Sequence, residues 1–83
     1  MSLHLQSVQI ASGSDDSESQ LVFSDGFLVA VLVHLSEMHE KDAGMWFLEA
    51  GFGPVSIREQ PSFVDLNAAQ AWIACRLSES RTN

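Results

Sequence analysis

The apolar run at residues 27–33 (FLVAVLV) constrains the fold of this chain more than any other segment. Val29, Val31 and Val33 are β-branched, which favours a strand over a helix. The run is far too short to span a bilayer. An antiparallel strand with one face in water should alternate apolar and polar residues, and this run does not. The sequence therefore predicts a strand that needs cover on both of its faces.

A second apolar stretch, 21–23, precedes Ser24-Asp25-Gly26, and together the two stretches predict a β-hairpin. A two-residue turn at Asp25-Gly26 would place residues 21 and 23 on the face opposite residues 27 and 29. A type I turn with a left-handed Gly26, followed by a bulge, would place all four residues on one face. Core patterning favours the second turn.

Residues 45–52 (MWFLEAGF) predict the next strand, antiparallel to 27–35. With a connection over 37–44, Val33 faces Leu48 and Val31 faces Ala50, which brings the apolar-rich faces of both strands to one side. The opposite face is then also apolar, and Glu49 is its main charge. That second face would carry Val22, Leu28, Ala30, Leu32, His34, Met45 and Phe47.

Short strands are also expected at the N-terminus, with a bulge near Ser7, and at 55–57. Asp65 is a good N-cap for a helix over 66–77. The helix should pack on the sheet through residues at helical spacing, which are Leu66, Ala69, Ile73 and Leu77. The predicted fold is α+β: an antiparallel meander of three to five strands with one C-terminal helix on one face. We expect residues 1–83 to form a single domain, with a mobile acidic loop at 11–20 and a frayed tail at 79–83.

Two apolar surfaces remain after one helix has covered one face of the sheet. One is the second sheet face, and the other is a helix stripe of Ala68, Ala71, Trp72 and Cys75. Soluble monomers rarely expose large apolar patches, so these surfaces favour association with a second copy or with another protein. The residues expected to form the contact are Leu28, Leu32, Phe47 and Trp72. In the alternative, the N-terminal strand folds over the outer face and Trp72 packs against 53–64.

Charge narrows the class of partner. The chain carries 11 acidic and 4 basic residues, for a net charge of −7, and the cations are scattered. Nucleic acids and anionic membranes need clustered cations, so neither is expected as a partner. The N-terminus lacks the pattern of a signal peptide, and the single cysteine, Cys75, suits a reducing compartment. The predicted location is the cytoplasm.

No motif predicts catalysis. Cys75 lies within the expected helix, where nothing activates its thiol, and no serine sits in a nucleophile elbow. A non-catalytic interaction or homo-oligomerising module, without cofactor or metal, is therefore the preferred function. The alternative is a small-ligand or metal-binding protein that uses the His34–Asp42 region, where histidines and carboxylates gather without a recognised ligand spacing.

Overall fold

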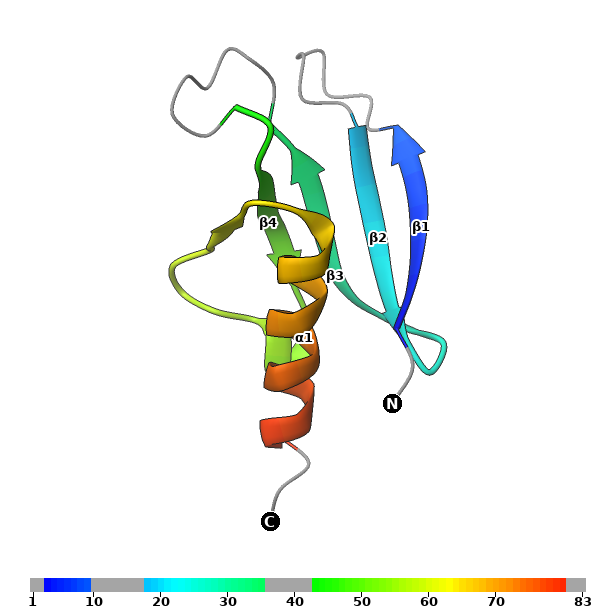
Figure 1. The fold of residues 1–83 in the computed structure, drawn as a ribbon. Coiled ribbons are helices and arrows are strands. Elements are labelled where there is room, and N and C mark those ends of the chain that lie inside the picture. The colour runs from blue at the N-terminus through cyan, green and yellow to red at the C-terminus, as the bar shows by residue number, and fades with distance from the viewer. Residues whose placement is uncertain (1–2, 10–17, 36–42, 81–83) are drawn as a thin grey trace.

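The computed structural model describes residues 3–9, 18–35 and 43–80, and these fold into one antiparallel sheet with one α-helix (Figure 1). The five strands lie in the sheet in chain order, as an open meander, which confirms the predicted α+β class. The elements are β1 (Leu3–Gln9), β2 (Glu18–Ser24), β3 (Phe27–His34), β4 (Trp46–Gly51), the 3-10 helix η2 (Gly53–Val55), β5 (Ser62–Phe63) and α1 (Leu66–Ser80).

The turn between β2 and β3 has two residues, Asp25 and Gly26, and both have positive φ angles of 51° and 88°. Ser24 lies opposite Phe27, so this is a type I′ turn, the type that an Asp-Gly pair favours. The predicted type I turn with an adjacent bulge is therefore wrong. The bulge comes farther along β3 and makes Val29 its extra residue, because Val22 lies opposite Ala30 whereas Phe23 lies opposite Leu28.

A second bulge lies between β3 and β4. Val31 lies opposite Ala50, as predicted, but Leu32 and not Val33 lies opposite Leu48, so Glu49 is the extra residue. One extra residue exchanges the two faces of a strand, since successive side chains point to opposite sides. The predicted pairing of Val33 with Leu48 is wrong for this reason. The predicted bulge at Ser7 is also wrong, because β1 runs in continuous register with β2 from Leu3 to Gln9.

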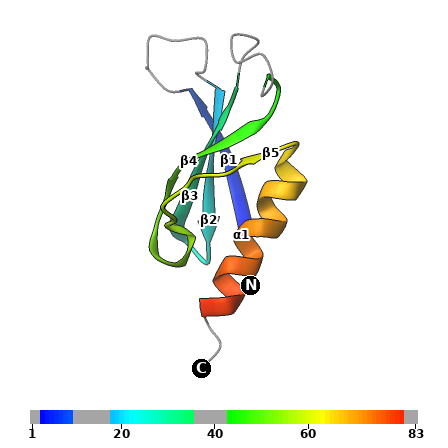
Figure 2. The ribbon, with the colours of Figure 1, turned by 90° about the vertical axis from the view of Figure 1, so that its left-hand side faces the viewer.

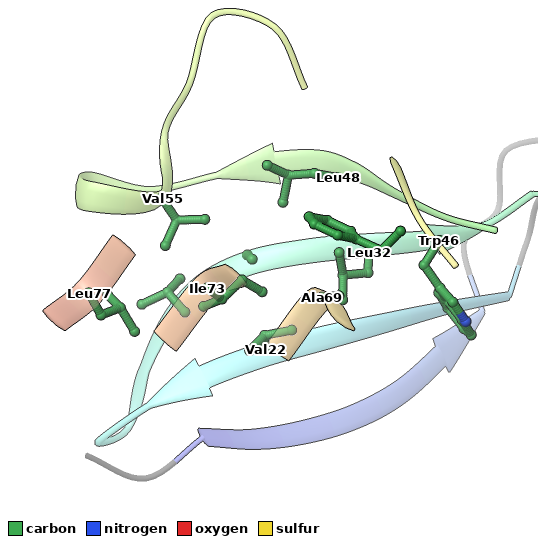
Figure 3. Packing of buried hydrophobic residues seen from close by; sticks show 11 residues of the cluster. Val22, Leu32, Trp46, Leu48, Val55, Ala69, Ile73 and Leu77 are labelled. Atoms are coloured by element: carbon green, nitrogen blue, oxygen red, sulfur yellow. The ribbon is translucent and has the colours of Figure 1, made fainter. Parts of the chain in front are cut away.

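The side of the sheet that carries α1, called here the inner face, holds the core (Figure 3). Directly opposed residues point to the same side, and the register therefore sorts the strands into two faces. Inner-face residues that belong to the buried cluster are Val22, Ala30, Leu32, Trp46, Leu48 and Phe63, with Leu3 and Leu5 packed partly against it.

Helix α1 forms where the sequence predicted it. The Asp65 carboxylate accepts a hydrogen bond of 2.8 Å from the Ala68 N–H, which confirms the N-cap. Ala69, Ile73 and Leu77 are buried against the sheet, and Leu66 is half-buried, so the predicted core face of the helix is correct (Figure 3).

The segment between β4 and α1 differs from the expected strand at 55–57, since the regular elements there are η2 and β5. Val55 is fully buried. Its carbonyl group lies so near to Gly51 in space that a Cβ atom at Gly51 would collide with it. The Arg76 guanidinium reaches from α1 and donates a hydrogen bond of 3.0 Å to the Pro54 carbonyl. The close approach at Gly51 holds the segment against β4, and the Arg76 bond holds it against the helix.

The limits of the predicted loop and tail shift accordingly. Of the acidic loop at 11–20, Glu18, Ser19 and Gln20 belong to β2, whereas residues 11–17 lie outside the described residues. Glu79 and Ser80 belong to α1, and the rest of the expected tail also lies outside the described part. Within 3–9, 18–35 and 43–80, no helix is long and apolar enough to cross a membrane.

Candidate interaction surface

The sheet side opposite α1, called here the outer face, is formed by three rows of opposed residues. The one α-helix among the described elements, α1, lies on the inner side of the sheet and does not cover this face (Figure 2). The first row is Val8, Ser19, Val33, Phe47 and Ser62; the second is Gln6, Leu21, Val31 and Ala50; the third is His4, Phe23 and Leu28.

The three rows of the outer face are mainly apolar and contain no fully charged residue. None of its residues is Asp, Glu, Lys or Arg, and His4, whose ring lies 6.3 Å from that of Phe23, is its one titratable group. Glu49, the extra residue of the β4 bulge, is exposed next to Ala50, and Glu18 comes directly before Ser19 in the sequence, on the opposite parity of β2. An apolar face without charges is unusual on a chain whose net charge is −7.

Ser19 is the one polar residue that the outer face buries completely. It lies between Val8 and Val33 in its row, is 0% exposed, and its Oγ has no hydrogen-bond partner. A buried hydroxyl without a partner destabilises the folded state, because it has given up its bonds to water. At this point the outer face excludes solvent from the Ser19 hydroxyl but provides no hydrogen-bond partner for it.

Two of the four expected contact residues lie on the outer face. Leu28 is 36% exposed in the third row, and Phe47 is half-buried in the first. The N-terminal strand does not fold over them, because β1 pairs with β2 at the sheet edge. This finding contradicts the alternative in which β1 covers the outer face.

The predicted place of Leu32 on the outer face is wrong. It lies in the core against α1 and is 0% exposed, because the β4 bulge places it opposite Leu48. A partner cannot contact Leu32 without displacing the helix. The outer position at this level of β3 belongs to Val33, which lies opposite Phe47.

Trp72 lies apart from the outer face, in a cluster on the helix side. Its ring is 5.5 Å from that of Phe63, and the Arg76 guanidinium lies 5.5 Å above the Trp72 ring. Arg76 also donates to the Pro54 carbonyl, so the cluster joins α1 to the segment that follows β4. Trp72 thus packs against residues of 53–64, as the alternative expected, and it is half-buried there.

His34 lies on the inner face and not on the outer face, for the same reason as Leu32. Its Nδ1 is 3.3 Å from a carboxylate oxygen of Glu18, and its ring lies 4.8 Å from that of Trp46. This contact closes the end of the core and leaves the ring about a third exposed. The remaining histidine and acids of the His34–Asp42 region, at 36–42, lie outside the described residues. In the part of the chain that is described, no three His, Cys, Asp or Glu residues converge on a metal position.

Reasoning from the sequence missed Leu21, Phe23 and Val31 as members of the outer face. The signal was present in Asp25-Gly26, because this pair prefers the two-residue turn that separates residues 21 and 23 from the core. No protein-family model matches the chain, and comparisons with curated proteins and with solved structures found no significant match. The outer face is therefore the feature from which a function can be inferred.

Proposed function

We propose that this protein is a non-catalytic self-association module whose outer face contacts the outer face of a second copy. The observation that supports this proposal is a sheet face whose three rows are mainly apolar and free of full charges, with α1 on the other side. Burying side chains such as Leu28 and Phe47 in a contact would stabilise that contact by roughly 25 cal/mol for each Å² of apolar surface removed from water.

Charge favours a second copy over a basic partner. A basic protein would be drawn to the acidic surfaces of a chain of net charge −7, and not to its neutral face. Two copies of the chain repel each other through those same acidic surfaces. They can approach closely only where carboxylates are absent, and the outer face meets that condition.

Geometry permits the contact but makes it weak. Two antiparallel sheets pack face to face at about 10 Å, with their strands rotated by about 30°. Strands β1–β4, spaced by about 4.8 Å and rising by about 3.3 Å per residue, present a face of roughly 450 Å². A stable interface buries about 800 Å² on each partner, so we expect the outer face alone to give a reversible dimer.

Sedimentation velocity over a wide range of concentrations tests the proposal with two neighbouring variants. Leu28→Glu puts a carboxylate on the outer face of each copy and should weaken the concentration-dependent association, because the contact between outer faces is lost. Phe27→Glu adds the same charge one residue away. Phe27 is 75% exposed and lies opposite Ser24, off the outer face, so this variant should associate like the unchanged protein.

Two results would contradict the proposal. One is a monomer at every concentration for the unchanged protein. The other is an equal response of the Leu28→Glu and Phe27→Glu variants, because the contact would then not lie on the outer face.

A further inference from the structure

Strand β1 forms one edge of the sheet, and among the described residues only β2 pairs with it. We propose that β1 pairs antiparallel with β1 of a second copy, which joins two sheets into one. This contact goes beyond the proposed function, because it uses the backbone of the sheet edge and not the side chains of the outer face. It stands whether or not the outer faces also meet.

The turn at Asp25-Gly26 shows which backbone groups of β1 are not bonded to β2. In a type I′ turn the Ser24 carbonyl faces the Phe27 N–H, so the backbone of Ser24 points toward β3. Backbone groups alternate in direction along an antiparallel strand. The even residues of β2 therefore point to β3, and its odd residues point to β1.

The odd residues of β2 lie opposite His4, Gln6 and Val8, which are consequently the positions bonded to β2. The backbone N–H and C=O groups that point away from the sheet belong to the residues between and beside them. These are Leu3, Leu5, Ser7 and Gln9, which form a regular row of donors and acceptors.

The sequence and register of β1 show none of the features that normally keep an edge strand from pairing. Exposed edges are usually protected by lysine or another charge, by proline, by a bulge or by short length. The sequence LHLQSVQ contains no proline, lysine, arginine or carboxylate, and its register with β2 is unbroken over seven residues. The edge at the other side of the sheet is β5, which has two residues.

A second copy fits this edge because the edge complements itself. With a twofold axis through Gln6, Leu5 lies opposite Ser7 of the second copy and Leu3 lies opposite Gln9, so all four free positions are bonded. The pairing brings no like charges together, although each chain has a net charge of −7. An axis at Leu5 or Ser7 would leave part of the row unpaired.

Joining two sheets also provides the contact area that the outer face of one copy is too small to supply. The twofold axis of an antiparallel strand pair runs perpendicular to the sheet, so both outer faces lie on the same side of the joined sheet. The joined sheet presents roughly 900 Å² of continuous outer face, which reaches the size of a stable interface. The edge contact thus prepares a larger surface for the face contact.

Amide hydrogen exchange read residue by residue by NMR is the sharpest test. At low concentration the amides of Leu5, Ser7 and Gln9 should exchange fast, whereas those of His4, Gln6 and Val8 are protected by β2. At high concentration the three odd amides should become protected as well. Fast exchange of the odd amides in a sample that sedimentation shows to be dimeric would overturn the proposal, and so would a monomer at every concentration.

Engineered disulfides test the register with a matched pair, both in a Cys75→Ser background because Cys75 is exposed. Gln6 and its symmetry mate form a pair without mutual hydrogen bonds, with Cα atoms about 4.5 Å apart, which lies within the range of a disulfide. Gln6→Cys should therefore form a covalent dimer in air. His4→Cys, on the same face, lies about 13 Å from its mate and should stay reduced. Equal cross-linking of the two variants would overturn the register.

Ser7→Pro distinguishes the edge contact from the face contact. It removes an N–H that points away from the sheet, so the monomer tolerates it as edge strands tolerate proline, whereas the second copy loses its bond. Ser7→Ala is the control. The proposal predicts that Ser7→Pro abolishes the protection of the odd amides while Leu28→Glu leaves that protection in place. Protection that survives in a folded Ser7→Pro variant would overturn the edge contact without touching the proposed function.

Discussion

The two faces of the sheet are made from the same strands, but α1 covers only the inner face. Leu32 and Leu28 are the same residue type in the same strand, yet Leu32 is 0% exposed beneath α1 and Leu28 is 36% exposed on the outer face. Composition does not separate the faces, because both are apolar. The difference arises from two bulges and one turn, which decide which half of an almost uniformly apolar strand the helix covers.

The largest expected effect comes from truncating the two leucines. Leu32→Ala leaves a cavity under α1 and should lower the free energy of unfolding by about 2–5 kcal/mol. A small domain has only about 5–15 kcal/mol of stability in total, so this change takes a large share of it. Leu28→Ala should lower it by less than about 1 kcal/mol, because the side chain is partly in water already. Urea denaturation at low protein concentration measures both, and equal losses would erase the distinction between the faces.

Gly51 tests the inner face where the chain passes from β4 to η2. A methyl group at Gly51 would meet the backbone of Val55, so Gly51→Ala should lower the free energy of unfolding by about 1–3 kcal/mol through overpacking. Ser56→Ala, at an exposed position of the same segment, is the control and should have little effect. Thermal denaturation followed by circular dichroism compares the two. A Gly51→Ala variant as stable as the control would mean that this segment yields easily.

Asp65 tests how firmly the helix covers the inner face. Asp65→Ala removes the acceptor of the Ala68 N–H and should lower the free energy of unfolding by about 1 kcal/mol. Asn67→Ala, two residues later and exposed, is the matched control and removes no cap. Denaturant titration followed by Trp fluorescence suits the pair, and a stable Asp65→Ala variant would show that packing alone sets the start of α1.

Ser19 gives the smallest effect and reports on the outer face. Ser19→Ala deletes a buried hydroxyl that has no partner, so the monomer should keep its stability or gain up to about 1 kcal/mol. Leu21→Ala, in the next row of the same strand, should instead cause a loss, because it removes apolar contact. A clear loss of stability in Ser19→Ala would show that the hydroxyl has a bonding partner in solution.

Most of the architecture could be predicted from local patterns. The helix with its Asp65 cap and its buried Ala69, Ile73 and Leu77 follows from helical spacing, and the antiparallel meander follows from short apolar runs separated by turns. These features depend on residues close together in the chain, where propensity and periodicity are informative.

The assignment of residues to faces could not be predicted in the same way. In a run where every residue is apolar, the pattern does not show which alternate residues face the core. A bulge such as that at Glu49 depends on packing between strands, and it exchanges the two faces of the strand beyond it. The bulge at Glu49 therefore places Leu32 and His34 on the inner face, contrary to the prediction. Leu28 lies on the outer face because the bulge at Val29 separates it from Leu32, and Phe47 lies there because it alternates with Trp46 and Leu48. That two apolar faces exist was therefore predictable, whereas which leucine belongs to which face was not.

The meander order of the strands has a kinetic consequence. Every strand pairs with its neighbour in the chain, so each pairing closes a short loop and loses little chain entropy. The tight turn between β2 and β3 makes that hairpin the expected nucleus, with α1 docking late because the core that it completes reaches back to β2 and β3, far away in the chain. We expect folding in milliseconds or less, fast for a sheet of this size. Slowing by substitutions at the turn, and not by those at the helix cap, would be the kinetic signature of this order.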